Sequence, residues 1–129
     1  MRTFKTKWVV RFARRERITD RSLLEAIARA ERGLVDADLG GGIIKQRVAR
    51  PGQGRSGGFR MVVAYRVADR AVFLFGFAKN ERENIAPDEL VTLREIGAAW
   101  LAADGRQIAR SISEDALHEV DGDGDETQT

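Results

Sequence analysis

Residues 43–78 read IIKQRVARPGQGRSGGFRMVVAYRVADRAVFLFGFA, and this stretch decides the fold. Runs rich in β-branched and aromatic residues at 43–50, 59–67 and 71–78 are separated by turn-forming residues. The first separator, PGQGRSGG, is interpreted as a flexible connection, and the second, at 68–70, as a tight turn. Strands that follow one another through short connections pair antiparallel. The stretch therefore predicts a three-stranded meander, with the very apolar third strand buried on both faces.

Helices are predicted on either side of this meander. Residues 3–12 begin as a strand and run into a short helix, and residues 19–33 form a second helix. We expect the outer face of that second helix to carry Arg21, Glu25, Arg29 and Arg32. Pro87 begins a third helix, because proline suits the first helical position, and Asp104-Gly105 ends it. Residues 113–120 are compatible with a short helix or an added strand.

Charge along the predicted strands is one-sided. Between Leu39 and Ala68 the chain has no carboxylate but six cations, namely Lys45, Arg47, Arg50, Arg55, Arg60 and Arg66. Because side chains alternate along a strand, Lys45 and Arg47 share a face, and Arg60 can approach it from the paired strand. Such a surface is typical of proteins that bind a polyanion, with phosphate the first candidate. Two interpretations stay open, a grip on a phosphate group and a solvated face that serves solubility.

The totals describe a chain of 129 residues with a net charge of +2, which predicts one domain. Residues 1–110 hold all 22 Lys and Arg against 13 Asp and Glu, and residues 111–129 hold the other seven carboxylates. We expect a basic body and an acidic, disordered end at 121–129. The lack of cysteine excludes disulfides and thiolate chemistry, and the single His118 is interpreted as a bystander. Without a signal peptide or a spanning segment, we expect a cytoplasmic protein that does not contact membranes.

Aromatic and polar residues near the strands supply further candidates. Lys79 to Asn84 directly follow the third strand, where a rigid element can aim them at a ligand, although taken alone these residues favour an ordinary solvated loop. Trp8 and the cluster formed by Phe73, Phe75 and Phe77 are interpreted as core. Phe59 and Tyr65 lie on the basic strand and are able to stack a base if they are exposed.

Two segments resemble a known family: AERGLVDADLGGGIIKQRVARPGQGRSGGFR at 30–60 and FGFAKNERENI at 75–85. They are similar to the RelE/ParE superfamily of type II toxins, and more narrowly to its RelE-like, HigB-related branch. The resemblance covers Phe4 to Leu101. It implies an α+β fold in which two N-terminal helices pack on a twisted antiparallel sheet that is followed by a C-terminal helix. We expect a toxin domain over 1–104 and an extension over 105–129 that ends in the acidic tail.

The resemblance also implies an activity, a metal-independent and cofactor-free endoribonuclease that cuts messenger RNA on the ribosome. In this reaction the 2′-hydroxyl attacks the adjacent phosphate, giving a 2′,3′-cyclic phosphate and a 5′-hydroxyl. A cognate antitoxin, bound in a hetero-oligomer, neutralises the toxin. The catalytic positions of the family fall on Lys45, Arg47, Arg60, Lys79 and Arg82. We add as RNA contacts Arg50, Arg55, Phe59 and Asn80.

Departures from the family pattern keep other functions open. Asn80 stands where the best-known relatives have an arginine, and Ala86 where they have a stacking tyrosine. One alternative is a non-catalytic inhibitory toxin, like the ParE branch that acts on DNA gyrase. Another is a nucleic-acid-binding regulator.

Overall fold

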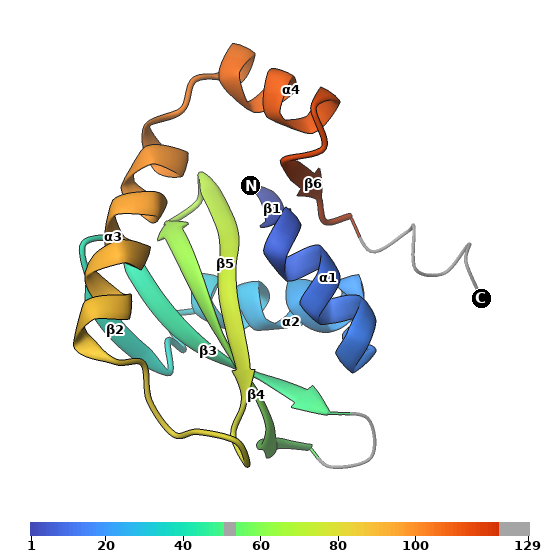
Figure 1. The fold of residues 1–129 in the computed structure, drawn as a ribbon, viewed down its shortest axis with the longest axis vertical. Coiled ribbons are helices and arrows are strands. Elements are labelled where there is room, and N and C mark those ends of the chain that lie inside the picture. Colours follow the sequence, from blue (N-terminus) through green and yellow to red (C-terminus); the bar gives the residue numbers. More distant parts are fainter. Residues whose placement is uncertain (51–53, 122–129) are drawn as a thin grey trace.

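The computed structural model describes residues 1–50 and 54–121, without the side chains of 54–56. The chain forms an α+β structure, as predicted (Figure 1). Its elements in order are β1 (Arg2–Thr6), α1 (Lys7–Glu16), α2 (Asp20–Glu31), β2 (Ala37–Gly40), β3 (Ile43–Arg50), β4 (Gly54–Arg66), β5 (Arg70–Ala78), α3 (Pro87–Ala102), α4 (Gly105–Ser113) and β6 (Leu117–Glu119).

The described strands form one sheet in the order β2-β3-β4-β5-β1-β6. The predicted meander is confirmed, since β3, β4 and β5 pair antiparallel in sequence. The sheet as a whole is mixed, because β1 runs parallel to β5, and the prediction of an antiparallel sheet is wrong there. The physical reason is the connection. Hairpins force antiparallel pairing, whereas two helices and three strands separate β1 from β5.

Glycines lie at two places where the observed strands differ from the predicted ones, the turn after β2 and the start of β4. β2 was not predicted, and the glycines that follow it form its turn into β3, with positive φ at Gly40, Gly41 and Gly42. β4 begins at Gly54 and pairs back with Arg50, so the predicted flexible connection is shorter than expected. Residues 51–53 of that connection lie outside the described residues.

Two apolar cores lie on the two faces of the sheet. The first joins buried residues of α1 and α2 with Ile44, Met61 and Phe73. The second joins buried residues of α3 and α4 with Ile43 and Val62. Because strand side chains alternate, the Ile43 face of β3 continues with Lys45 and Arg47. α3 therefore covers one end of this face, and the cations occupy the other end.

The C-terminal part differs from the single predicted helix. α3 ends at Ala102, and Asp104 caps a further helix, α4, where its Oδ1 accepts a hydrogen bond from the Gln107 amide at 2.8 Å. Residues 117–119, left open between helix and strand, form β6, which pairs antiparallel with β1. The predicted acidic tail lies, from residue 122 on, outside the described residues. No helix of the described chain is both long and apolar enough to cross a bilayer.

Candidate nucleic-acid interface

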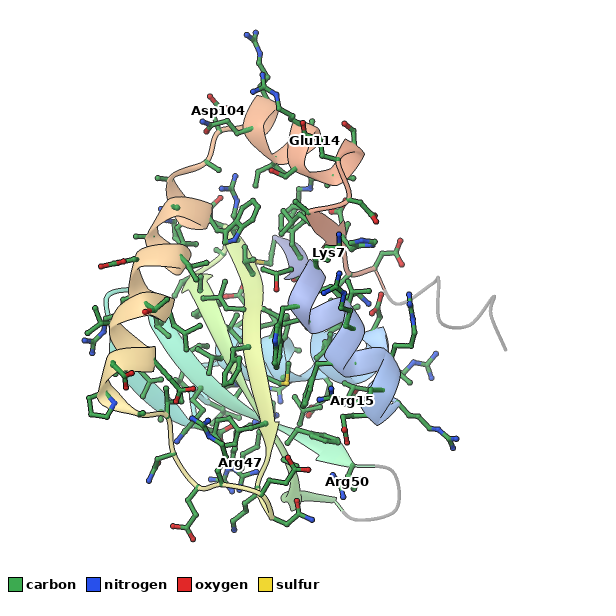
Figure 2. The ribbon with its side chains drawn as sticks, in the orientation of Figure 1. Lys7, Arg15, Arg47, Arg50, Asp104 and Glu114 are labelled. Carbon is green, nitrogen blue, oxygen red and sulfur yellow. The ribbon has the colours of Figure 1, made fainter. Side chains whose placement is uncertain are left out.

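The structure brings Lys45, Arg47 and Arg60 together, and we call these three residues the cationic row. Arg47 of β3 and Arg60 of β4 are direct register partners, and Phe77 of β5 is the next partner of Arg60. Lys45 lies two residues from Arg47 and is half-buried on the same face. Figure 2 shows Arg47 at the end of the sheet beside the loop that joins β5 to α3. Rigid, paired strands thus aim three cations into one region.

Arg60 is the most enclosed arginine of the cationic row. Burial lowers the pKa of its guanidinium, and the nearby charge of Arg47 lowers it further, while Asp36 acts in the opposite direction. An anion bound between the two arginines offsets both lowering effects. The arrangement is suited to a phosphate group, whose non-bridging oxygens can accept hydrogen bonds from both guanidinium groups.

A largely buried network of ion pairs and hydrogen bonds positions Arg47. Arg29 of α2 is 5% exposed and pairs with Asp36 (Nη1–Oδ2, 3.1 Å), and it also donates to the Arg47 carbonyl. Asp36 in turn accepts from the Arg47 amide at 2.7 Å and lies 3.5 Å from Arg47 Nε. The expectation that Arg29 lies on the outer face of its helix is therefore wrong. Its side chain reaches the end of β3 and is paired there instead of being solvated.

The residues after β5 have different environments. Lys79 and Asn80 are exposed at the end of the strand. Arg82 forms an ion pair with Glu89 in the first turn of α3 and lies 5.1 Å above the centroid of Phe77. Since Phe77 is the register partner of Arg60, Arg82 lies next to the cationic row, but Glu89 neutralises it. Three residues of the predicted catalytic set therefore form the cationic row. Arg82 lies next to this row, and Lys79 is exposed at the end of β5.

The structure contradicts one predicted RNA contact, Phe59, and places another, Arg50, away from the cationic row. Phe59 is fully buried in the core shared with α1 and α2, so its ring offers no surface to a base. Arg50 lies over that ring, 4.8 Å from the centroid, and pairs with Glu16 of α1 at 3.7 Å. Both side chains are on the face opposite to the cationic row, because side chains alternate along each strand. The side chain of Arg55 lies outside the described residues.

A family model described as the RelE toxin of the RelE/RelB toxin-antitoxin system matches residues 1–120. The chain belongs to the RelE toxin family. It is therefore a type II toxin of the RelE/ParE superfamily, as the two sequence segments predicted. No match is found among curated proteins. In the described part of this RelE-family toxin, no group of three His, Asp or Glu side chains is placed to hold a metal ion.

The only tyrosine of this RelE-family toxin lies away from the cationic row. Tyr65 is buried in the first core, and its hydroxyl donates to Glu31 of α2. Burial and this hydrogen bond raise the pKa of Tyr65 to about 12. His118, on β6, pairs with Asp115 at 2.9 Å. Neither side chain is therefore available to the cationic row as a proton carrier.

The raised pKa of Tyr65 gives a direct test of this part of the fold. Because the chain has one tyrosine, an absorbance titration of phenolate reports this group alone. We expect a midpoint at about 12 in the folded toxin. The stability that neutral Tyr65 contributes is complete below its unfolded pKa of about 10 and is lost as pH rises toward 12. A midpoint near 10 in a protein that is still folded would contradict the buried hydrogen bond.

Glu89 is expected to restrain Arg82. The variant Glu89→Gln keeps an oxygen that can accept from the Ala86 amide but removes the charge that holds Arg82. We predict that it binds a short RNA about two- to fivefold more tightly at low salt, since a partly exposed ion pair is worth little. Glu95→Gln is the matched control, because it removes the same charge from an exposed position of the same helix and Glu95 forms no ion pair with Arg82. Equal gains in the two variants would show that only net charge matters.

Sequence reasoning missed the carboxylates that surround the cationic row. Asp36 lies three residues before the carboxylate-free stretch, and Glu89 lies beyond it. For Glu89 a signal existed, because an acidic residue three positions after Ala86 fits a helix start and so lies near the preceding loop. For Asp36 the sequence carries no comparable signal, since its contact with Arg47 depends on how β2 returns to β3.

Proposed function

We propose that this RelE-family toxin is a ribosome-dependent messenger RNA endonuclease that acts through the cationic row. The observation that carries the proposal is the direct cross-strand pairing of Arg47 with Arg60 on the face shared with Lys45. Like charges placed opposite each other destabilise a sheet, so an anionic ligand is the simplest reason to keep them there. Family membership favours RNA as that ligand.

The proposed reaction needs charge stabilisation and proton transfer. When the 2′-hydroxyl attacks the adjacent phosphate, negative charge grows on the non-bridging oxygens, and Arg60 and Arg47 are positioned to bind them. An arginine does not release its proton at neutral pH. Lys45 is therefore the residue of the row suited to protonate the leaving 5′-oxygen, and the proton of the attacking 2′-hydroxyl passes to solvent water, from which Lys45 regains its own. Lys79 and Arg82 are assigned to neighbouring phosphates, and Arg82 takes part once it leaves Glu89.

Each of two alternative functions is supported by an observation on this chain. The ion pair of Arg82 with Glu89, together with Asn80 and Ala86, favours a non-catalytic inhibitor of the ParE kind, acting on DNA gyrase. The basic charge of the strands is also compatible with a nucleic-acid-binding regulator. Two results together would identify a regulator. The purified protein would shift operator DNA in a gel, and its expression would cause no growth arrest.

Primer extension on a reporter transcript after induced expression tests the nuclease proposal. We expect new 5′ ends within translated codons that disappear when translation initiation is blocked, and fragments that carry a 5′-hydroxyl. Growth arrest with intact transcripts would refute the nuclease and favour the gyrase inhibitor.

The proposed partners follow from the same assignment. We place the toxin in the cytoplasm, in a hetero-oligomer with an antitoxin encoded by a neighbouring reading frame, and within the HigB-related branch. Co-purification of the toxin with the product of that frame tests the pairing.

A further inference from the structure

Trp8 lies on the surface, although its sequence pattern predicts a core residue. Its side chain is 42% exposed in the first turn of α1. It is nevertheless held in place, because its ring stacks on Phe12 (centroids 5.2 Å apart, planes at 17°) and contacts Phe75 of β5 (4.6 Å). An aromatic ring that is both oriented and exposed has the properties of a stacking platform.

The position of Trp8 is explained by the short pairing of β1 with β5. β1 pairs with β5 only from Arg70 to Phe73, so residues 74–78 have no described strand on that side. The chain leaves β1 there and begins α1, so that β5 lies between α3 and α1 (Figure 1). Trp8 thus reaches the unpaired edge of β5 next to Phe75.

Aromatic rings connect this edge to the cationic row. Phe75 lies 6.4 Å from Phe77 between ring centroids, and Phe77 is the register partner of Arg60. Arg82 lies over both rings, 5.8 Å from the centroid of Phe75 and 5.1 Å from that of Phe77. Trp8, Phe75 and Phe77 therefore form a continuous path that ends at Arg60.

The charges on the two sides of the Trp8–Phe75 pair are opposite. Lys7 and Arg11 are exposed on α1, and Figure 2 shows Lys7 at the start of that helix. On the other side, a pocket of about 240 Å³ adjoins Phe75 and is lined also by Asp88, Glu89, Thr92 and Leu93. Cations attract phosphates, whereas carboxylates repel phosphates but accept hydrogen bonds from the amino groups of bases.

From this arrangement we infer that Trp8 and Phe75 form a base-binding subsite for single-stranded RNA, next to the cationic row. A base stacks on the Trp8 ring with its amino edge toward Asp88 and Thr92, and the attached phosphate lies toward Lys7 and Arg11. The inference rests on the proposed function, because it takes the same RNA as ligand and gives it a path across the unpaired edge of β5.

Binding of non-cleavable 2′-deoxy-substituted oligonucleotides to Trp8 variants tests the subsite. Trp8→Leu keeps an apolar side chain against Phe12 and Phe75 but removes the stacking surface. We expect it to weaken binding at least about fivefold, with Trp8→Phe retaining most of the affinity. An abasic oligomer with the same number of phosphates should bind the wild type and Trp8→Leu equally. Thermal unfolding of each variant verifies that the fold is intact.

Fluorescence of Trp8 gives a second, independent measurement. The chain has two tryptophans, so the variant Trp100→Phe leaves Trp8 as the single reporter. Stacking predicts saturable quenching by the oligonucleotide and none by the abasic oligomer. Equal quenching by both, or a Trp8→Phe variant that binds as poorly as Trp8→Leu, would overturn the subsite.

Comparison with Arg60→Ala separates this inference from the proposed function. If Arg60→Ala weakens binding and Trp8→Leu does not, the role of the cationic row in phosphate binding is supported and the subsite is refuted. If Trp8→Leu weakens binding and Arg60→Ala does not, the subsite stands and the role of the cationic row fails.

Discussion

Replacing Arg60 by Ala is expected to reduce messenger RNA cleavage by roughly 100- to 1,000-fold, the usual effect of removing one donor that stabilises transition-state charge. Arg60 is the residue of the cationic row most affected by burial and by a neighbouring cation. Its interaction with phosphate therefore occurs in a partly desolvated place, where electrostatic stabilisation is stronger than in water. Arg60→Lys should fall between the wild type and Arg60→Ala, because a single ammonium replaces the planar fork.

Single-turnover cleavage on programmed ribosomes is the measurement for this prediction, and Arg66→Ala is its control. Arg66 lies on the same strand but is exposed and pairs with Asp69 at 3.0 Å. Its removal costs the toxin the same charge, so we expect nearly wild-type cleavage. Equal losses in the two variants would mean that overall charge, rather than the cationic row, drives the reaction. Unchanged cleavage by Arg60→Ala would remove Arg60 from the chemistry.

Replacing Arg29 by Met is expected to have the largest effect on stability. The side chain of Arg29 is 6% exposed and that of its partner Asp36 is 19% exposed, so the change leaves a largely buried carboxylate with only the more distant Arg47 Nε, 3.5 Å away, as a cation. Breaking such a pair costs about 3–5 kcal/mol of unfolding free energy. Glu25→Gln removes the partner that is 50% exposed and should cost less than about 1 kcal/mol. Urea unfolding measures both.

A second substitution sharpens the test of the Arg29 network. Adding Asp36→Asn to Arg29→Met removes the uncompensated charge, so the double variant should lose less stability than the sum of the single variants. Burial raises the pKa of Asp36, but the amide of Arg47 and the ion pair with Arg29 outweigh it and hold that pKa below its usual value. This contribution to stability is therefore complete above pH ~4 and is lost as the pH falls further. Additive losses, or a pH profile unchanged by Arg29→Met, would contradict the network.

The same network links stability to the proposed site. Arg29 and Asp36 hold the backbone of Arg47 on both sides, through its carbonyl and its amide. Gln46, fully buried, fixes Asp36 in turn by accepting from its amide at 2.7 Å. Because Asp36 also lies 3.5 Å from Arg47 Nε, the network positions the guanidinium of Arg47 as well as its backbone.

Much of the fold was predictable because the determining signals are local. Apolar runs and turn residues determined the β3–β5 meander, and Pro87 marked the start of α3. The common face of Lys45, Arg47 and Arg60 followed from the two-residue period of a strand and from antiparallel pairing. The two sequence segments also identified the family that the comparison confirmed.

The environments of the candidate residues were not predictable in this way. Phe59 is an exception, because the alternation of side chains along β4 already places it on the face opposite Arg60, and the expected base contact overlooked this. Trp8 was expected in the core, and its exposure follows from where β1 stops pairing with β5.

By itself, the sequence determined the β3–β5 meander, the helices α1 to α3 and the face on which Lys45, Arg47 and Arg60 lie, because these follow from periodicities within a few residues. Only the tertiary structure decided which cations are neutralised, since Asp36, Glu16 and Glu89 come from other elements. It also decided the parallel place of β1 and, with it, the unpaired edge of β5. Contacts between distant segments depend on sheet order and register, and no local pattern encodes them.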